Sequence, residues 1–168
     1  KHRNVVKRLQ CLDYNNFNPM KILMVCLGNI CRSPLAEGIM RAKAESAGLK
    51  IKVDSAGTSD YHIGEAPHRN SVRIASEHNI DITGLKARQF TKADLETFDL
   101  IYVMDESNYK NVIQLATNKE QREKVLYLLN EVNPGSNASV PDPWYGGYDG
   151  YRQVFDLLEE ACSIIARK

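Results

Sequence analysis

Hydrophobic positions along the chain form short continuous runs that alternate with stretches of helical periodicity. The first run, Ile22–Val25, leads into a loop and then into apolar positions spaced three or four residues apart up to about Gly48. Further runs lie at 51–53, 100–104 and 125–129, and helical patterns follow at about 70–78, after Thr91, after Asp105 to about 116, and after Gly150. Continuous apolar runs are typical of strands buried on both faces of a parallel sheet. The alternation predicts an α/β fold with helices on both faces of the sheet.

Several polar residues mark where helices are expected to begin. Ser33, followed by a proline, is typical of an N-cap and a first helical position. Thr91 with Asp94 three residues later resembles a capping box, and Asp105 can cap the helix after the 100–104 run. Residues 130–150 contain three prolines and four glycines and show no clear periodicity. A stretch of roughly 20 structureless residues inside a compact domain is usually functional, so we expect this loop to serve the site.

The chain has 168 residues, of which 43% are hydrophobic, enough for one domain with a substantial core. Its net charge of +1 is unevenly distributed, because residues 1–19 carry a balance of +3 and the remainder carries −2. Residues 1–19 also show no usable periodicity. We therefore predict an N-terminal extension over 1–19, disordered or foreign to the natural protein, and a single domain over 20–168.

Charge and composition exclude several classes of function. A slightly acidic domain argues against broad nucleic-acid binding, which needs a basic face. No window approaches the ~20 apolar residues of a membrane span, and no apolar signal core follows the basic start, so we expect a cytoplasmic protein without membrane insertion. The cysteines, at positions 11, 26, 31 and 162, form no C-x-x-C pair, and the four histidines show no zinc-site spacing. No metal and no cofactor are predicted, and each thiol is either buried or reactive.

The loop between the first strand and the first helix carries the candidate chemistry. Open α/β sheets bind ligands at the carboxyl ends of their strands, and a helix N-terminus favours an anion. Cys26 opens this loop and Arg32 closes it, with up to six backbone N–H groups between them. Gly28 and Asn29 tolerate the positive φ that a loop needs in order to turn successive amides inward. The loop is therefore predicted to bind a phosphate-like anion.

Within such a loop, Cys26 is the candidate nucleophile. Inward amides, the helix dipole and Arg32 would all stabilise negative charge at the centre, so we expect a thiolate at neutral pH. The planar fork of Arg32 suits two phosphoryl oxygens, and Ser33 can donate its hydroxyl hydrogen to the thiolate. Cysteine and arginine at this spacing are common by chance. The preceding strand and the following helix are what favour a functional motif over a chance match.

A thiolate displaces an alkoxide or phenolate slowly unless an acid protonates the leaving oxygen. Asp142 is the best candidate, because it lies between prolines in the predicted loop and is followed by Trp144, Tyr145 and two glycines. The prolines stiffen the approach, the glycines permit motion, and the aromatic rings could flank an aromatic substrate. The alternative is an ordinary turn aspartate beside surface aromatics.

Five segments together resemble, in order, the low molecular weight protein tyrosine phosphatase family; they are 25–34, 54–57, 86–89, 104–108 and 142–145. The resemblance covers about residues 20–168. It implies a three-layer sandwich with a four-stranded parallel sheet, flavodoxin-like and of the phosphotyrosine protein phosphatase I type. It also implies hydrolysis of phosphotyrosine in tyrosine-phosphorylated protein substrates through a cysteinyl-phosphate intermediate. The sequence leaves the oligomeric state open, with a monomer as the default.

The resemblance assigns roles to individual residues. Cys26 is the nucleophile, Arg32 and the loop amides bind phosphate, and Asp142 is the general acid and then the general base. The implied phosphate-binding loop contains Leu27, Gly28, Asn29, Ile30, Cys31 and Ser33; the supporting network is Asn29, Ser33 and Ser55; the pocket rim is Tyr61, Trp144 and Tyr145. One departure is visible, since some family members carry histidine in the network where this chain has Leu85.

The remaining cysteines and histidines have weaker claims. By the resemblance, Cys31 is a redox partner that can form a reversible disulfide with Cys26, and otherwise it is a small buried residue beneath the loop. Cys162 falls on the apolar face of the last helix. His62, His68 and His78 are expected on ordinary loop or helix surface.

Three other functions compete with this interpretation. A thioredoxin-coupled arsenate reductase would need two further cysteines in the middle of the chain, and residues 32–161 contain none. Protein arginine phosphatases resemble the loop but carry a small threonine where this chain has Ile30, which would crowd a branched guanidinium. A catalytically silent phosphotyrosine-binding module would have no use for Asp142.

Overall fold

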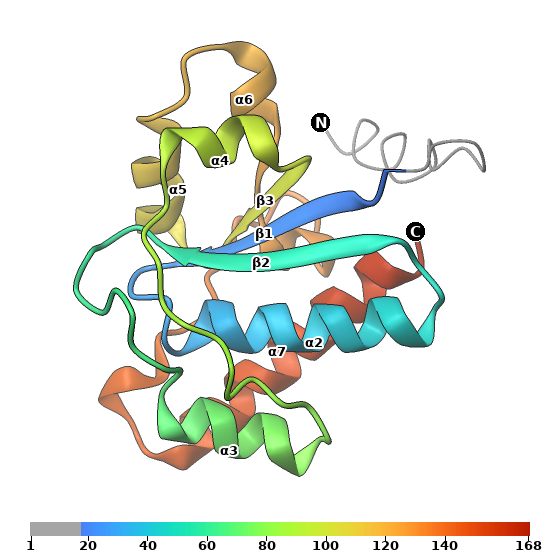
Figure 1. Ribbon diagram of the computed structural model, residues 1–168, viewed down its shortest axis with the longest axis vertical. Coiled ribbons are helices and arrows are strands. Elements are labelled where there is room, and N and C mark those ends of the chain that lie inside the picture. Colours follow the sequence, from blue (N-terminus) through green and yellow to red (C-terminus); the bar gives the residue numbers. More distant parts are fainter. Residues whose placement is uncertain (1–17) are drawn as a thin grey trace.

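The computed structural model describes residues 18–168, which form an α/β fold around one parallel sheet (Figure 1). The strands are β1 (Met20–Cys26), β2 (Ile51–Gly57), β3 (Leu100–Val103) and β4 (Val125–Tyr127), in the order β2-β1-β3-β4. This arrangement confirms the predicted four-stranded parallel, flavodoxin-like sheet. The predicted extension over 1–19 lies almost wholly outside the described residues.

Helices cover both faces of the sheet, giving three layers (Figure 1). The helices are α2 (Arg32–Ser46), α3 (Arg69–Glu77), α4 (Lys92–Thr97), α5 (Glu106–Ile113), α6 (Lys119–Glu123) and α7 (Tyr148–Ala166), with 3-10 turns η1 (Leu128–Glu131) and η2 (Pro143–Tyr145). The helices α2, α3 and α7 lie on one face, and α4 and α5 lie on the other with α6 beside β4.

The central strand explains why its sequence is continuously apolar. Ile22 and Met24 pack into the core under α2 and α7, whereas Leu23 and Val25 pack into the core under α4 and α5, and all four are fully buried. Successive side chains of a strand point to opposite faces, so a strand covered on both sides has no polar positions. The strand β1 therefore delivers its last residue, Cys26, to a rigidly packed edge.

Several helix boundaries agree with the predicted caps. The Asp94 carboxylate accepts the N–H of Thr91 (2.8 Å), and the Asp105 carboxylate accepts the N–H of Asn108 at the start of α5 (2.8 Å). Cys162 is buried on α7 as predicted, and burial raises the pKa of its thiol to about 12. Such a thiol is inert at neutral pH.

Other boundaries differ from the sequence patterns. The helix α2 begins at Arg32, so the prediction that Ser33 is its N-cap is wrong. Strand β2 extends to Gly57 rather than stopping at residue 53, because its polar half pairs with β1 as far as Cys26. Strand β4 is correspondingly shorter than its apolar run, and residues 128–131 form a 3-10 turn instead. The five-residue helix α6 was not predicted.

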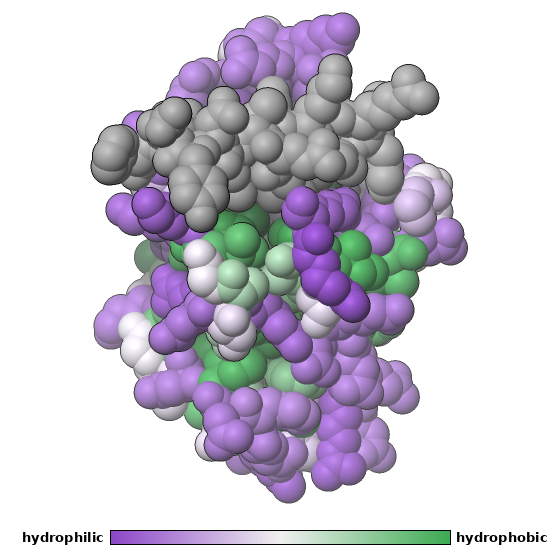
Figure 2. Space-filling model, turned by 90° about the vertical axis from the view of Figure 1, so that its right-hand side faces the viewer, coloured by the Kyte–Doolittle hydropathy of each residue, from purple (hydrophilic) through white to green (hydrophobic). Residues whose placement is uncertain are grey.

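No helix formed by residues 18–168 has the length and apolar character of a transmembrane span. Where residues 18–168 are visible, the side of the molecule at the amino ends of the strands shows mainly hydrophilic side chains around a smaller group of hydrophobic ones (Figure 2). Within the same residues, no group of three or more His, Cys, Asp or Glu side chains could hold a metal ion.

Candidate active site

The loop from Cys26 to Ser33, hereafter the anion loop, lies at the carboxyl end of the central strand and enters α2. Asn29 has φ 56°, as its residue type allows, but Gly28 does not take the positive φ predicted for it. A Cβ atom at Gly28 would lie 2.9 Å from the ring of His62, so a larger residue there would require this ring to shift. A single left-handed residue thus turns the loop.

Neighbouring segments hold the loop by its carbonyl groups. The carbonyls of residues 26, 27, 30 and 31 accept hydrogen bonds of 2.7 to 3.1 Å from the backbone N–H groups of Thr58, Ser59 and His68 and from the hydroxyl group of Ser71. In a trans peptide the next N–H points opposite to the carbonyl, so the following amides face the loop interior. At Gly57, behind the loop, a Cβ atom would lie 2.7 Å from the carbonyl oxygen of Leu27.

The inward amides have no acceptor of their own. Within residues 18–168, none of the backbone N–H groups of 27–33 donates a hydrogen bond to a protein atom. Unpaired N–H groups at the start of a helix, converging on one point, make an anion-binding site. These unpaired amides agree with the predicted amide nest, and Cys26, which opens the loop, is only 2% exposed.

Arg32 lines the same cavity as Cys26 and lies in the first turn of α2. Its Nη1 donates to the Asp105 carboxylate (2.7 Å) and to the carbonyl of Val140 (3.0 Å), while its Nη2 lies 3.6 Å from the Asp142 carboxylate. Burial alone would lower the pKa of Arg32, but the charges of Cys26 and the two aspartates outweigh it and raise the pKa. A buried, oriented and permanently charged guanidinium results. Sequence reasoning gave Asp105 only a capping role.

The predicted supporting residues form one hydrogen-bonded chain. The Asn29 amide donates to the hydroxyls of Ser33 (2.8 Å) and Ser55 (2.9 Å), and the Ser33 hydroxyl lies 3.0 Å from the Cys26 sulfur. Because Asn29 donates to the Ser33 oxygen, the Ser33 hydrogen can point at the Cys26 sulfur, at 3.0 Å, or at the carbonyl of Ala56, the longer contact at 3.4 Å. A hydroxyl donor 3.0 Å from the sulfur stabilises a thiolate.

The chain continues to a buried carboxylate that the sequence did not reveal. Ser55 donates to Glu37 at 2.5 Å, and Arg41 one helical turn later pairs with the other oxygen of Glu37. Burial raises the pKa of Glu37 despite these two partners. Leu85, where some relatives have histidine, packs against the apolar core instead. The only available signal was an acidic residue on an otherwise buried helix face.

Asp142, Trp144 and Tyr145 lie above the anion loop in a segment around η2, hereafter the acid segment (residues 141–147). The Asp142 carboxylate accepts the N–H of Trp144 (3.1 Å), and its side chain is one-third exposed. Trp144 is 48% exposed, whereas Tyr61 and Tyr145 are 72% and 91% exposed. A cavity of about 210 Å³ runs between these side chains down to Cys26 and Arg32. The structure therefore brings the predicted loop, acid and rim residues together.

The chain that carries this thiol, this arginine and these amides is similar to known proteins over most of its length. The family model for low molecular weight phosphotyrosine protein phosphatase matches residues 21–168. The chain belongs to this family. It is accordingly a protein-tyrosine-phosphatase, a phosphoric monoester hydrolase, and the sequence resemblance is confirmed.

Individual relatives of this phosphatase are similar over most of their length. YfkJ of Bacillus subtilis is 41% identical over 145 residues, covering 85% of this chain and 91% of the relative, and its crystal structure matches with a TM-score of 0.82. The phosphatase of Schizosaccharomyces pombe is 38% identical over 154 residues, covering 88% and 97%. YwlE of Bacillus subtilis, described as an arginine phosphatase, matches at 32% identity and a TM-score of 0.80, covering 88% of this chain and 94% of YwlE.

Two histidines of this phosphatase were predicted on ordinary surface, but they lie at the site. His62 lines the cavity, with its ring 5.9 Å from that of Trp144. His68 stacks on Tyr151 (5.2 Å) and meets the Trp144 ring edge-on (5.5 Å), and burial lowers its pKa. His68 thereby links the acid segment to α7. His78 is exposed, in agreement with the prediction.

Cys31 is part of the anion loop of the phosphatase and is buried, 6% exposed, with its sulfur 3.5 Å from the Tyr151 hydroxyl. Both Cys26 and Cys31 line the cavity, and both are free thiols. Burial raises the pKa of Cys31 to about 11 even though the Tyr151 hydrogen bond lowers it. Cys31 is therefore a protonated thiol at neutral pH.

Proposed function

We propose that this phosphatase hydrolyses phosphotyrosine in proteins through a phosphocysteine formed on Cys26. The observation that supports this most is the set of unpaired N–H groups of residues 27–33 around the Cys26 sulfur. These donors match the equatorial oxygens of a phosphoryl group in transfer, and Arg32 adds a fixed positive charge. The same arrangement would serve no purpose for a merely structural cysteine.

In the first step, the Cys26 thiolate attacks phosphorus in line with the tyrosine oxygen. The sulfur–phosphorus bond forms as the phosphorus–oxygen bond breaks, and the transferring oxygens stay within reach of the loop amides and Arg32. Asp142, on the opposite side of the cavity, donates its proton to the departing phenolate. The protein is left with phosphocysteine, and tyrosine is released.

In the second step, the Asp142 carboxylate takes a proton from a water molecule that attacks phosphorus. The sulfur–phosphorus bond breaks, inorganic phosphate leaves, and the electron pair returns to the sulfur of Cys26. The Ser33 hydroxyl, 3.0 Å from this sulfur, stabilises the thiolate as a leaving group. Asn29 keeps that hydroxyl in place by donating to its oxygen.

The rim supports an aromatic substrate. Tyr61, Trp144 and Tyr145 stand around a cavity whose floor is Cys26, so a phenyl ring would lie between aromatic side chains while its phosphate reaches the sulfur. A phosphoserine side chain has no ring to span this depth. Tyrosine-phosphorylated proteins are therefore the proposed substrates.

Arginine phosphatase activity is the second candidate, favoured by the similarity to YwlE. Against it stands Ile30, which is 6% exposed and lines the cavity where a smaller threonine is expected for a phosphoarginine substrate. The bulk of Ile30 would crowd a branched guanidinium more than a flat ring.

The test is turnover of three substrates side by side: an aryl phosphate, a phosphotyrosine peptide and the matching phosphoarginine peptide. We expect the first two to react and the third to react at least about tenfold more slowly, judged by kcat/KM. The Ile30→Thr variant should raise only the phosphoarginine rate. Binding of phosphotyrosine peptide without any release of phosphate would instead support a silent binding module. A cytoplasmic location, a monomeric state and the single-domain boundary at residue 20 stay predictions.

A further inference from the structure

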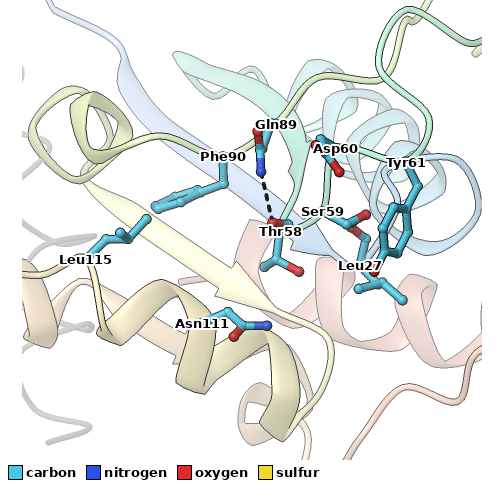
Figure 3. A pocket seen from close by; sticks show the side chains of 9 residues that line it. All are labelled: Leu27, Thr58, Ser59, Asp60, Tyr61, Gln89, Phe90, Asn111 and Leu115. Carbon is cyan, nitrogen blue, oxygen red and sulfur yellow. Dashed lines mark hydrogen bonds between the residues drawn. The ribbon is translucent and has the colours of Figure 1, made fainter.

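A second, larger cavity of about 470 Å³ lies beside the catalytic one, and the mechanism above does not use it (Figure 3). It is lined by Leu27, Thr58, Ser59, Asp60, Tyr61, Gln89, Phe90, Asn111 and Leu115. Leu27 and Tyr61 also line the catalytic cavity. The two cavities therefore share a wall, so a residue that flanks the side chain presented to Cys26 lies within reach of the second cavity.

The lining of the second cavity contains several hydrogen-bonding side chains and one carboxylate. In Figure 3 the amide of Asn111 projects from α5 toward Thr58, and the Gln89 amide donates to the carbonyl of Thr58 (3.4 Å). The Thr58 hydroxyl oxygen is buried and has no hydrogen-bond partner within residues 18–168. Asp60 is the one charged residue among those that line the cavity, and no lysine, arginine or histidine is among them.

Neighbouring basic side chains are already engaged by other carboxylates. The guanidinium of Arg88, next to Gln89, binds Asp54 and Asp94, each at 3.0 Å. Lys110, next to Asn111, pairs with Glu106 at 3.1 Å. Asp60 forms no ion pair within the described part of the chain, so the cavity has an uncompensated negative charge at its edge.

We propose that this cavity is a substrate subsite that binds a lysine or arginine side chain about one or two residues from the phosphotyrosine, with Asp60 as its ion-pair partner. The proposal rests on the proposed function, because it requires the phosphotyrosine to occupy the adjacent site. The apolar wall suits such a side chain, since Phe90 and Leu115 can cover its methylene groups while its charged end reaches the polar side. An acidic residue at the same position would be repelled.

The experiment uses phosphotyrosine peptides that carry lysine, norleucine or glutamate at position −2, −1, +1 or +2 relative to the phosphotyrosine. The readout is kcat/KM at low ionic strength. For one position we expect lysine to exceed glutamate by about fivefold, the range of a partly exposed ion pair. Asp60→Asn should bring this ratio close to one. Asn111→Lys, on the opposite side of the cavity and on an exposed helix position, should reverse it.

Two controls separate the subsite from other effects. Glu120→Gln removes the same charge from α6, which lines neither cavity, and should leave the ratio unchanged. An aryl phosphate has no flanking residue, so its kcat/KM should be the same in Asp60→Asn and wild type. A lysine-to-glutamate ratio that Asp60→Asn does not change overturns the subsite while leaving the phosphatase activity intact.

Failure of the proposed phosphatase reaction would give a different result from failure of the subsite. If neither aryl phosphate nor phosphotyrosine peptide is hydrolysed, the proposed reaction fails. Dissociation constants of the same peptides on Cys26→Ser protein then decide the subsite independently, because binding needs no turnover. A lysine preference that disappears in the Cys26→Ser, Asp60→Asn double variant supports the subsite, and equal affinities overturn it.

Discussion

The anion loop and the acid segment face each other across one cavity, yet they are built in opposite ways. In the loop, Cys26, Arg32 and Ser33 are at most 3% exposed, and the carbonyl groups are held from outside. In the acid segment, Trp144 and Tyr145 are half to nine-tenths exposed, and a Cβ atom at either glycine of the segment would meet nothing within 4 Å. One side is packed rigidly and the other is open to solvent.

This difference indicates that the anion loop and the acid segment contribute to different parts of the reaction. Stabilising a transition state needs donors that are fixed before the substrate arrives, because reorganisation would cost part of the benefit. Admitting a protein substrate and protonating its leaving group need side chains that reach solvent. Variants of the loop should therefore change the chemistry itself, whereas variants of the segment should act selectively on the substrate.

The largest effect is expected from Cys26→Ser. A serine hydroxyl leaves the amide nest in place but removes the nucleophile, so kcat/KM for a phosphotyrosine peptide should fall at least about 10⁴-fold. Peptide affinity, measured by fluorescence anisotropy, should stay within about tenfold of wild type. Cys162→Ala, which removes a buried thiol outside the site, should keep its activity. A Cys26→Ser protein that retains turnover would rule out the proposed nucleophile.

Asp142→Asn should have the next largest effect, and one that depends on the leaving group. The amide cannot donate a proton in place of the acid, so kcat/KM for phosphotyrosine should fall about 10²- to 10⁴-fold. An aryl phosphate with a strongly acidic phenol needs little protonation and should lose about tenfold or less. Asp149→Asn, an exposed carboxylate of the first turn of α7, serves as the control. Equal losses for all leaving groups would contradict the role of Asp142 as acid.

The raised pKa of Cys31, about 11, predicts how the proposed redox protection depends on pH. After peroxide oxidises Cys26 to a sulfenic acid, the Cys31 thiolate attacks that sulfur, the disulfide forms and hydroxide leaves. Below the pKa, the thiolate fraction of Cys31 rises about tenfold for each pH unit, so disulfide closure should accelerate by about that factor between pH 7 and 8.

Quenched samples analysed by mass spectrometry measure this rate. Tyr151→Phe removes the hydrogen bond that lowers the pKa of Cys31, so closure should slow in this variant at every pH below that pKa. A rate that does not change with pH, or accumulation of sulfinic acid on Cys26 without a disulfide, would contradict the resolving role of Cys31.

The smallest effect is expected from Tyr145→Ala. Its ring is 91% exposed at the rim of the cavity, where it would contact the substrate but not the reacting atoms, so KM for a phosphotyrosine peptide should rise about two- to threefold while kcat stays constant. Steady-state kinetics on the peptide and on a small aryl phosphate check this split. A change in kcat larger than the change in KM would place Tyr145 in the chemistry rather than at the rim.

Local sequence patterns were sufficient for the elements that depend on near neighbours. The run Ile22–Val25, the turn at Asn29 and the cap at Asp105 each rest on residues a few positions apart, and all three were predicted. Ser33 shows the limit of such reasoning. It has the right residue type and a following proline for a helix cap, but its hydroxyl lies between Cys26 and Asn29 instead.

The features that were missed depend on contacts between distant segments. Asp105 binds Arg32 across 73 positions, Glu37 accepts from Ser55 across 18, and His68 stacks on a ring of α7. None of these pairings leaves a mark in a single sequence, because each partner is an ordinary residue in its own segment. Asp142 was the best acid candidate on its local sequence of prolines, aromatic residues and glycines, whereas the redox role predicted for Cys31 came from the family resemblance alone.

The carbonyl groups that are held from outside have a consequence for the end of the catalytic cycle. The entropy lost in aligning the amides of residues 27–33 is lost when the chain folds, so it does not weaken the binding of any tetrahedral oxyanion. Inorganic phosphate, the product, fits the same donors as the substrate. Free phosphate should therefore act as a competitive inhibitor, and the phosphate level around the enzyme should raise the substrate concentration that it needs to reach a given rate.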